Sequence, residues 1–157
     1  MFGELNQEQI EELIRHQVIM RIGCHADGLT YVFPMSYAYD GKYIYGRALE
    51  GLKTQMMRKS PAVCVEVENM QDMANWQSVI AWGNYEELKT SKERNEALLK
   101  LHQRILPLVS SEMTVLSKEW PFSPEDPNAI RGLVFRICLE KKTGRFEMNN
   151  ATSNPSW

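Results

Sequence analysis

Hydrophobic side chains repeat at helical spacing in residues 7–16 and again in residues 91–106. In the first segment Ile10, Leu13 and Ile14 form one stripe, which is typical of a helix that buries a single face. The polar residues between them would face solvent. Both segments are therefore predicted as amphipathic helices that pack on the outside of a core. A third, shorter helix is expected at residues 52–59, between a glycine turn and a proline.

Elsewhere the pattern changes to alternation and to runs of β-branched and aromatic residues, which indicate strands. Asp27-Gly28 and Asp40-Gly41 separate three such runs, and Asp-Gly is a strong hairpin signal, so residues 18–48 are predicted as a three-strand meander. Pro34 interrupts the second run and is expected at a sheet edge, at a bulge or against a ligand. The predicted strands are 18–26, 29–39, 42–48, 62–68, 76–88 and 132–148, the last being either one strand bent at Thr143-Gly144 or a short hairpin.

About six antiparallel strands with outer helices define the expected fold, which is mainly β with flanking helices and closes into a small barrel. All 157 residues fit one domain. Gly83 marks an expected bulge and residues 69–75 an expected loop. After Pro107 we expect a helical piece at 108–116, a proline-rich loop at 120–130 and a flexible tail at 149–157.

Composition and charge narrow the classes of function. A formal net charge of −2 and a pI of about 6.0 leave no broad basic surface, so nucleic acid and anionic membranes are not expected as partners. The apolar runs are too short for a membrane span, and the acidic start of the chain is unlike a signal peptide, so we expect a cytoplasmic protein. Neighbouring Cys24 and His25 would point to opposite faces of a strand, so no metal site is expected.

The turn from strand to helix after Gly51 carries the first functional hypothesis. Backbone N–H groups at a helix start are unpaired and partly positive, and Lys53 adds a full charge there, so this point suits a phosphate. Thr54 could add a hydrogen bond. Arg47 at the end of the preceding strand could contribute a second charge, or it could form an exposed ion pair with Glu50.

Three segments together carry a family resemblance: YVFPMSYAYDGKYIYGRALEGLK, KSPAVCVEVE and QSVIAWGNYEEL. In order and spacing they resemble the FMN-binding split-barrel proteins related to pyridoxamine 5′-phosphate oxidase, and among these the nitroimidazole-resistance-type flavoproteins. The resemblance covers most of the chain. It implies a six-stranded antiparallel split β-barrel, an FMN cofactor and a homodimer with the flavin at the subunit interface.

The resemblance also assigns residues to the cofactor site. The strand that faces the isoalloxazine edge in the family corresponds to Pro34, Met35 and Ser36, and the pair near the ribityl phosphate corresponds to Gly46 and Arg47. The family's phosphate lysine corresponds to Lys53. The contact from across the dimer corresponds to Gln77 or Ser78. Leu52 stands where the oxidase has an arginine, so Arg47 or Arg21 would have to supply the second charge. The oxidase's C-terminal arginine–histidine substrate motif is absent.

These features predict an FMN-dependent oxidoreductase acting on a small molecule, either like pyridoxamine-phosphate oxidase or like a nitroreductase. The residues show no nucleophile constellation and no acid–base carboxylate pair, and a flavin enzyme needs neither, because the cofactor carries the redox chemistry. The alternative is a flavin- or haem-binding protein without turnover, used for storage or sensing. His16 and His102 are the helical histidines that could ligate haem.

Overall fold

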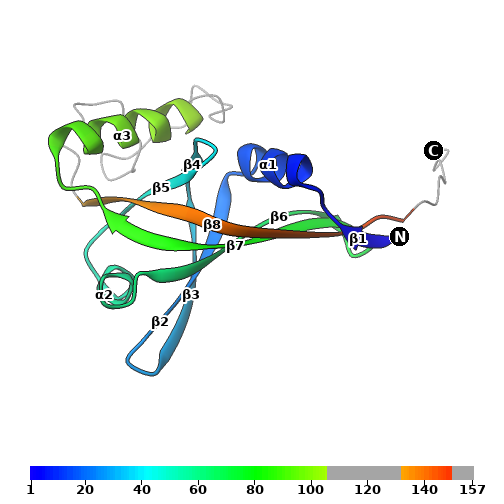
Figure 1. The fold of residues 1–157 in the computed structure, drawn as a ribbon, viewed down its shortest axis with the longest axis horizontal. Coiled ribbons are helices and arrows are strands. Elements are labelled where there is room, and N and C mark those ends of the chain that lie inside the picture. Colours follow the sequence, from blue (N-terminus) through cyan, green and yellow to red (C-terminus); the bar gives the residue numbers. More distant parts are fainter. Residues whose placement is uncertain (106–131, 150–157) are drawn as a thin grey trace, which may run out of the picture.

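The computed structural model describes residues 1–105 and 132–149 as a twisted antiparallel sheet with three helices packed on it (Figure 1). In Figure 1, α1 and α3 lie above strands β7 and β8, and α2 lies below them. In chain order the elements are β1 (Phe2–Glu4), α1 (Gln7–His16), β2 (Ile19–Ala26), β3 (Leu29–Ser36), β4 (Ala38–Tyr39), β5 (Tyr43–Ala48), α2 (Leu52–Lys59), β6 (Ala62–Asp72), β7 (Asn75–Glu87), α3 (Ser91–Ile105) and β8 (Leu133–Glu147).

The strands follow the order β3-β2-β6-β7-β8-β5-β4, and β1 adds to the side of β8. Every pairing in the described residues is antiparallel. The predicted fold class, a mainly β split barrel with flanking helices, is confirmed. The eight strands of the described residues exceed the predicted six because β1 and β4, of three and two residues, are too short to show a sequence period.

Local signals predicted most of the elements correctly. The first helix begins at Gln7 after the Asn6 cap. The Asn6 side chain accepts a hydrogen bond from the Gln9 backbone amide, and the Gln9 side chain accepts one from the Asn6 backbone amide. The first hairpin turns at Asp27 and Gly28, with φ of 51° and 76°, as the Asp-Gly signal requires. The β7–β8 register shifts between Trp82 and Gly83, where the bulge was predicted, but the extra residue, Glu140, lies on β8 and not on β7. The last segment is a single strand, β8.

The predicted meander is confirmed at its first pairing, β2 with β3, and in part at its second, because β4, the end of the predicted second strand, pairs with β5 across the Asp40-Gly41 turn. β3 itself does not pair with β5 but lies at the far edge of the sheet, and β5 also pairs with β8. The physical reason is Tyr37, which divides the predicted second strand into β3 and β4. Its ring is 1% exposed and its hydroxyl donates to the backbone oxygen of Ile14, 2.6 Å away, so the chain turns under α1 at this point.

The predicted loop at residues 69–75 is also wrong, because β6 and β7 continue through most of it. Only Met73 and Ala74 connect Asp72 to Asn75, and the Asp72 carboxylate accepts hydrogen bonds from the Ala74 amide and the Asn75 side chain. The two strands therefore form a long hairpin that reaches beyond the barrel toward the N-terminus (Figure 1). This hairpin carries the predicted residues Gln77 and Ser78.

Two clusters of buried side chains form the core. The larger cluster fills the space enclosed by the strands of the barrel and the two helices α1 and α2. The smaller cluster lies under α3, against β5 and β8. Met57 of α2 is fully buried and holds that helix against the barrel. The expectations for 108–116, 120–130 and 150–157 lie outside the described residues. Within the described ranges, no helix is long and apolar enough to cross a membrane.

Candidate functional site

The edge strand β3 carries the first group of predicted cofactor residues. Pro34 lies opposite Arg21 of β2 and is exposed, and Met35 and Ser36 follow as half-buried residues. Because β3 ends the strand order, its second backbone edge pairs with no strand of the described residues. Proline is at such an edge as predicted, since it has no N–H to donate. Within the described residues, no strand uses the backbone groups of this edge.

The start of α2 brings the predicted phosphate lysine to the same edge strand. The Nζ atom of Lys53 lies 5.3 Å from the centre of the Phe33 ring, next to Pro34. No side chain caps the first amides of α2, and no acidic residue lies in its first turn. Partly positive N–H groups and a lysine thus occur together without a protein anion among the residues of that turn. This arrangement suits a bound phosphate.

Thr54 and Gly46 have structural roles at this junction. The Thr54 side chain is fully buried; its hydroxyl accepts from the Gly51 amide at 3.0 Å and donates to the Gly51 carbonyl at 2.9 Å. This pair of bonds fixes the turn into α2. Gly46 is buried on β5, where an added Cβ would lie 2.6 Å from the Phe135 ring. Glycine at this position therefore lets Phe135 pack under the strand.

The two arginines considered for the second positive charge differ in their surroundings. Arg47 is partly buried, and burial together with the charge of Arg94 lowers its pKa. Its suggested pairing with Glu50 is replaced by another ion pair, because Glu50 binds the Arg58 guanidinium through both oxygens at 2.9 Å.

Arg21 lies on the sheet surface and is held by two carboxylates of β6. Its guanidinium lies 3.1 Å from the Glu66 carboxylate and 2.8 Å from that of Glu68. The charge of Arg21 is therefore already balanced within the sheet.

The residues predicted on β7 lie apart from this junction. Ser78 donates to the Glu66 carboxylate at 3.0 Å, and Gln77 faces the opposite side, toward α1. Two strands, β2 and β6, separate β7 from β3, which corresponds to about 14 Å at the usual strand spacing. Within one chain, Lys53 therefore lies next to the β3 edge, whereas Gln77 lies apart from Lys53 and from β3.

Part of the outward face of the sheet is apolar, beside the charged residues Arg21, Glu66 and Glu68. Directly opposed residues share a face, and one row across β3, β2, β6 and β7 consists of Val32, Gly23, Cys64 and Trp82. Val32 is 61% exposed and Trp82 40% exposed, and Ile80 beside them is 38% exposed. We call this row together with Ile80 the sheet face.

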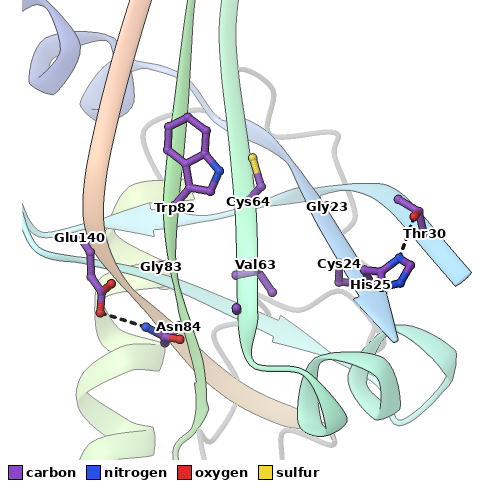
Figure 2. A pocket seen from close by; sticks show the side chains of 11 residues that line it. Gly23, Cys24, His25, Thr30, Val63, Cys64, Trp82, Gly83, Asn84 and Glu140 are labelled. Atoms are coloured by element: carbon purple, nitrogen blue, oxygen red, sulfur yellow. Dashed lines mark hydrogen bonds between the residues drawn. The ribbon is translucent and has the colours of Figure 1, made fainter. Parts of the chain in front are cut away.

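A pocket of about 420 Å³ is hollowed into the sheet face (Figure 2). Trp82 and Cys64 lie side by side on neighbouring strands, and two hydrogen-bonded pairs lie to either side of them. His25 is 2.8 Å from the Thr30 hydroxyl, and the Asn84 amide donates to Glu140 at 2.9 Å. None of the residues predicted to bind the cofactor lines this pocket, and sequence periodicity alone did not indicate it.

The chemistry of this pocket is that of packing rather than of covalent catalysis. Burial, with a smaller effect from the Glu66 charge, raises the pKa of the Cys64 thiol and keeps it protonated. Buried Cys24 and exposed His25 point to opposite faces, as predicted. The described part of the chain contains no group of three His, Cys, Asp or Glu residues placed to hold a metal ion.

The fold and the lysine-bearing helix start beside an open sheet edge define a split-barrel protein of the class that the sequence resembles. The chain belongs to the pyridoxamine 5′-phosphate oxidase family, whose model matches residues 6–146. An uncharacterized protein of Rhizobium meliloti is 26% identical over 150 residues, which cover 90% of this chain and 92% of that protein.

Two solved structures place the fold in the same class. An FAD-binding protein from Mesorhizobium loti aligns with a TM-score of 0.69 and 25% identity, over 93% of this chain and 98% of that one. A candidate 5-nitroimidazole antibiotic resistance protein from Bacteroides thetaiotaomicron aligns with a TM-score of 0.70 and 18% identity, over 93% and 87% of the two chains. At 18% identity the second likeness concerns the fold alone.

Proposed function

We propose that the protein is a homodimeric, FMN-binding oxidoreductase that acts on a small molecule. The observation that carries the proposal is Lys53, which stands at an uncapped helix start and against Phe33 of an open edge strand. Family membership and the FAD-binding neighbour support a flavin, and a terminal phosphate is the group that this helix start suits best. The cytoplasmic location stays a prediction.

The cofactor would be held at two places in one chain. Lys53 and the first amides of α2 would bind the phosphate, and the unpaired backbone edge at Pro34, Met35 and Ser36 would face the ring. Bound FMN supplies the transfer of hydride or electrons, and this chain supplies position and shielding from water. Gln77 and Ser78 are the remaining predicted contacts, and two strands, β2 and β6, lie between their strand and β3 within one chain.

A second copy of the chain resolves this separation. In a dimer that packs through the sheet face, the long β6–β7 hairpin of one protomer would turn Ser78, which shares this face with Ile80, toward its partner, while Gln77 would face away toward α1. The sheet face suits such an interface because Val32, Ile80 and Trp82 expose apolar area that a partner would cover. The pocket at Cys64 and Trp82 would become enclosed between the two copies.

The dimer gives the first prediction. Ile80→Glu places a carboxylate at the centre of the sheet face opposite Glu66, twice per dimer. Burying these charges should raise the dimer dissociation constant by at least about 100-fold. Sedimentation velocity of the purified variant at micromolar concentration should show a monomer, and FMN binding should weaken with it because each site loses its contribution from the partner.

The matched control for this prediction is Leu99→Glu on α3. Leu99 is 56% exposed and lies away from the sheet face, so its replacement should leave a dimer that binds FMN normally. A dimer of unchanged affinity in the Ile80 variant would refute the sheet face as the interface.

The proposed activity is tested with the purified full chain. The flavin is released and identified by chromatography, which distinguishes FMN from FAD, and the bound flavin is then exposed to NAD(P)H under nitrogen. Bleaching of the flavin band followed by reoxidation with a nitroaromatic compound supports an oxidoreductase. A bound flavin that neither donor reduces supports the non-catalytic alternative, a Soret band supports haem, and a colourless protein that ignores added FMN refutes the proposal.

A further inference from the structure

A second apolar cluster lies at the far end of the strands that carry the sheet face. It consists of Phe2, Met70 and Trp76, where β1 and the β6–β7 hairpin reach beyond the barrel (Figure 1). The rings of Phe2 and Trp76 pack edge to face with their centres 5.9 Å apart, and Met70 lies directly opposite Trp76. Phe2 is 63% exposed and Met70 is 62% exposed. We call these three residues the tip patch.

The tip patch lies on the same side of the sheet as the pocket at Trp82. Successive side chains of a strand point to opposite faces, so every second residue of β6 and β7 faces outward. In order from the pocket, the outward rows of the β6–β7 ladder are Ala62–Asn84, Cys64–Trp82, Glu66–Ile80, Glu68–Ser78 and Met70–Trp76. The pocket lies on the first two rows and the tip patch on the fifth, so the row of Ile80 lies midway between them.

The symmetry of a dimer relates these two ends. Two copies of one chain pair through a two-fold axis, so the shared surface must be complementary to itself. An axis through the row of Ile80 exchanges the first row with the fifth and the second with the fourth. The projecting tip patch of each copy then lies over the hollow of the other. An axis at the pocket would instead place hollow against hollow and enclose a void, which loses packing contacts.

The charged residues of the outward face fit the same axis. Lys141 of β8 lies opposite Trp82 in the second row, with its Nζ atom 5.3 Å from the centre of the indole ring. Glu68 of β6 belongs to the fourth row. Because β8 and β6 flank β7 on opposite sides, an axis on β7 places Lys141 of one copy over Glu68 of the other. Arg21 donates to one Glu68 oxygen, Oε1, at 2.8 Å, so the second oxygen can accept from the lysine.

The extent of this face approaches that of a stable contact between proteins. Five rows span about 27 Å along the strands, and the five strands from β2 to β1 span about 19 Å across them. The flat area is therefore roughly 500 Å², and the relief of the side chains makes the accessible area larger. Stable complexes bury about 800 Å² on each partner. Both ends of the face are needed to reach that area.

We propose that the tip patch of each copy fills the pocket at Cys64 and Trp82 of its partner. A methionine and two aromatic rings from the second copy would then complete a pocket that one chain leaves open. This inference rests on the proposed function, because it specifies how the two copies of the proposed dimer meet. It assigns the part of the β6–β7 hairpin beyond the barrel the role of holding the partner.

Cross-linking tests the contact directly. Met70→Cys and Asn84→Cys are combined in a chain that also carries Cys64→Ser, and the protein is treated with a bismaleimide that spans about the 10 Å between packed sheets. The two new thiols lie about 27 Å apart within one chain, so a link between them must join two copies. We expect a covalent dimer on a denaturing gel.

The matched controls for the cross-link are the two single variants in the same Cys64→Ser background. Each should run as a monomer on the denaturing gel, because the proposed axis also keeps the two copies of either thiol about 27 Å apart. A covalent dimer of equal yield in a single variant would overturn the proposed contact.

The affinity of the dimer provides a second measurement. Met70→Asp removes an apolar side chain from the contact and places a carboxylate there, so the dimer dissociation constant should rise about 10- to 100-fold in sedimentation velocity. Leu99→Asp on α3 is the matched control, because Leu99 is similarly exposed, at 56%, and should leave the constant unchanged. Circular dichroism should show the original fold in both variants, since neither side chain is buried.

The outcomes separate this inference from the proposed function. A dimer that gives no cross-link in the double variant, or that keeps its affinity in Met70→Asp, overturns the filling of the pocket and leaves the proposed FMN-binding dimer standing. A protein that sediments only as a monomer refutes the proposed homodimer, and the inference falls with it. A cross-link in a protein that binds no flavin supports the contact and refutes the proposed cofactor.

Discussion

Lys53→Ala should weaken FMN binding by about 10- to 100-fold while leaving riboflavin binding within about twofold. The variant removes one charge-assisted bond to the phosphate, a contribution of about 1.5–3 kcal/mol, and riboflavin lacks the phosphate that makes this bond. The uncapped amides of α2 remain, so some preference for FMN should persist. Fluorescence quenching of each flavin on titration with the protein measures both affinities.

The same helix provides the control. Lys59 lies in the last turn of α2 and pairs with Asp27 at the surface, so Lys59→Ala removes an equal charge from the far end. It should leave the FMN affinity unchanged, because a surface charge about 9 Å along the helix acts only weakly through solvent. If Lys53→Ala bound FMN with the affinity of the original protein, the assignment of Lys53 to the phosphate would be refuted. The description of the fold would not be affected.

The correct sequence predictions share a local cause. The capping box at Asn6 and Gln9, the Asp27-Gly28 turn and the proline after α2 act within a few residues, so a single sequence reveals them. Lys53 belongs to the same group, because its position at a helix start follows from the glycine before it. Both its placement and the open edge at Pro34 could therefore be predicted.

The incorrect predictions depended on partners far away in the chain. The pairing of β5 with β8 joins residues about ninety positions apart, and nothing within residues 18–48 distinguishes it from a meander. The redirection at Tyr37 depends on a carbonyl of α1. The 69–75 segment was predicted as a loop from its polar composition, and it is a strand because β7 and β6 pair almost to their connection.

The candidate site divides in the same way. Thr54 was expected at the phosphate because of its place in the helix, but its hydroxyl is used by Gly51, and a sequence does not show which of two partners a hydroxyl will bind. A pocket of about 340 Å³ between α1 and the β6–β7 hairpin was not predicted, although Gln9, Glu12 and His16 form a visible polar stripe. A stripe shows that a face is polar, and only the packing of α1 on the hairpin shows that this face lines a pocket.

Gly83→Ala should destabilise the protein by about 3 kcal/mol or more, and so lower the melting temperature by roughly 6–12 °C. An alanine Cβ at this position would lie 2.2 Å from the backbone oxygen of Cys138 and 2.9 Å from the Ile137 side chain. The clash is with the backbone of β8, and it can be relieved only by separating β7 from β8 at the bulge, where the register already shifts. Differential scanning calorimetry of the full chain gives the change.

Gly23→Ala shows why the expected loss belongs to that close approach and not to glycine replacement in general. Gly23 also lies in a strand, but the nearest atom to its added Cβ, the Cys64 oxygen, is 3.8 Å away. This variant should change stability by no more than about 1 kcal/mol, since an alanine that fits also restricts the unfolded chain. Equal melting temperatures for the two variants would mean that β8 moves away from Gly83 at little cost. The side chains of Trp82, Asn84 and Glu140, which line the pocket, would then be able to shift with β8 instead of being held in place by its close contact with Gly83.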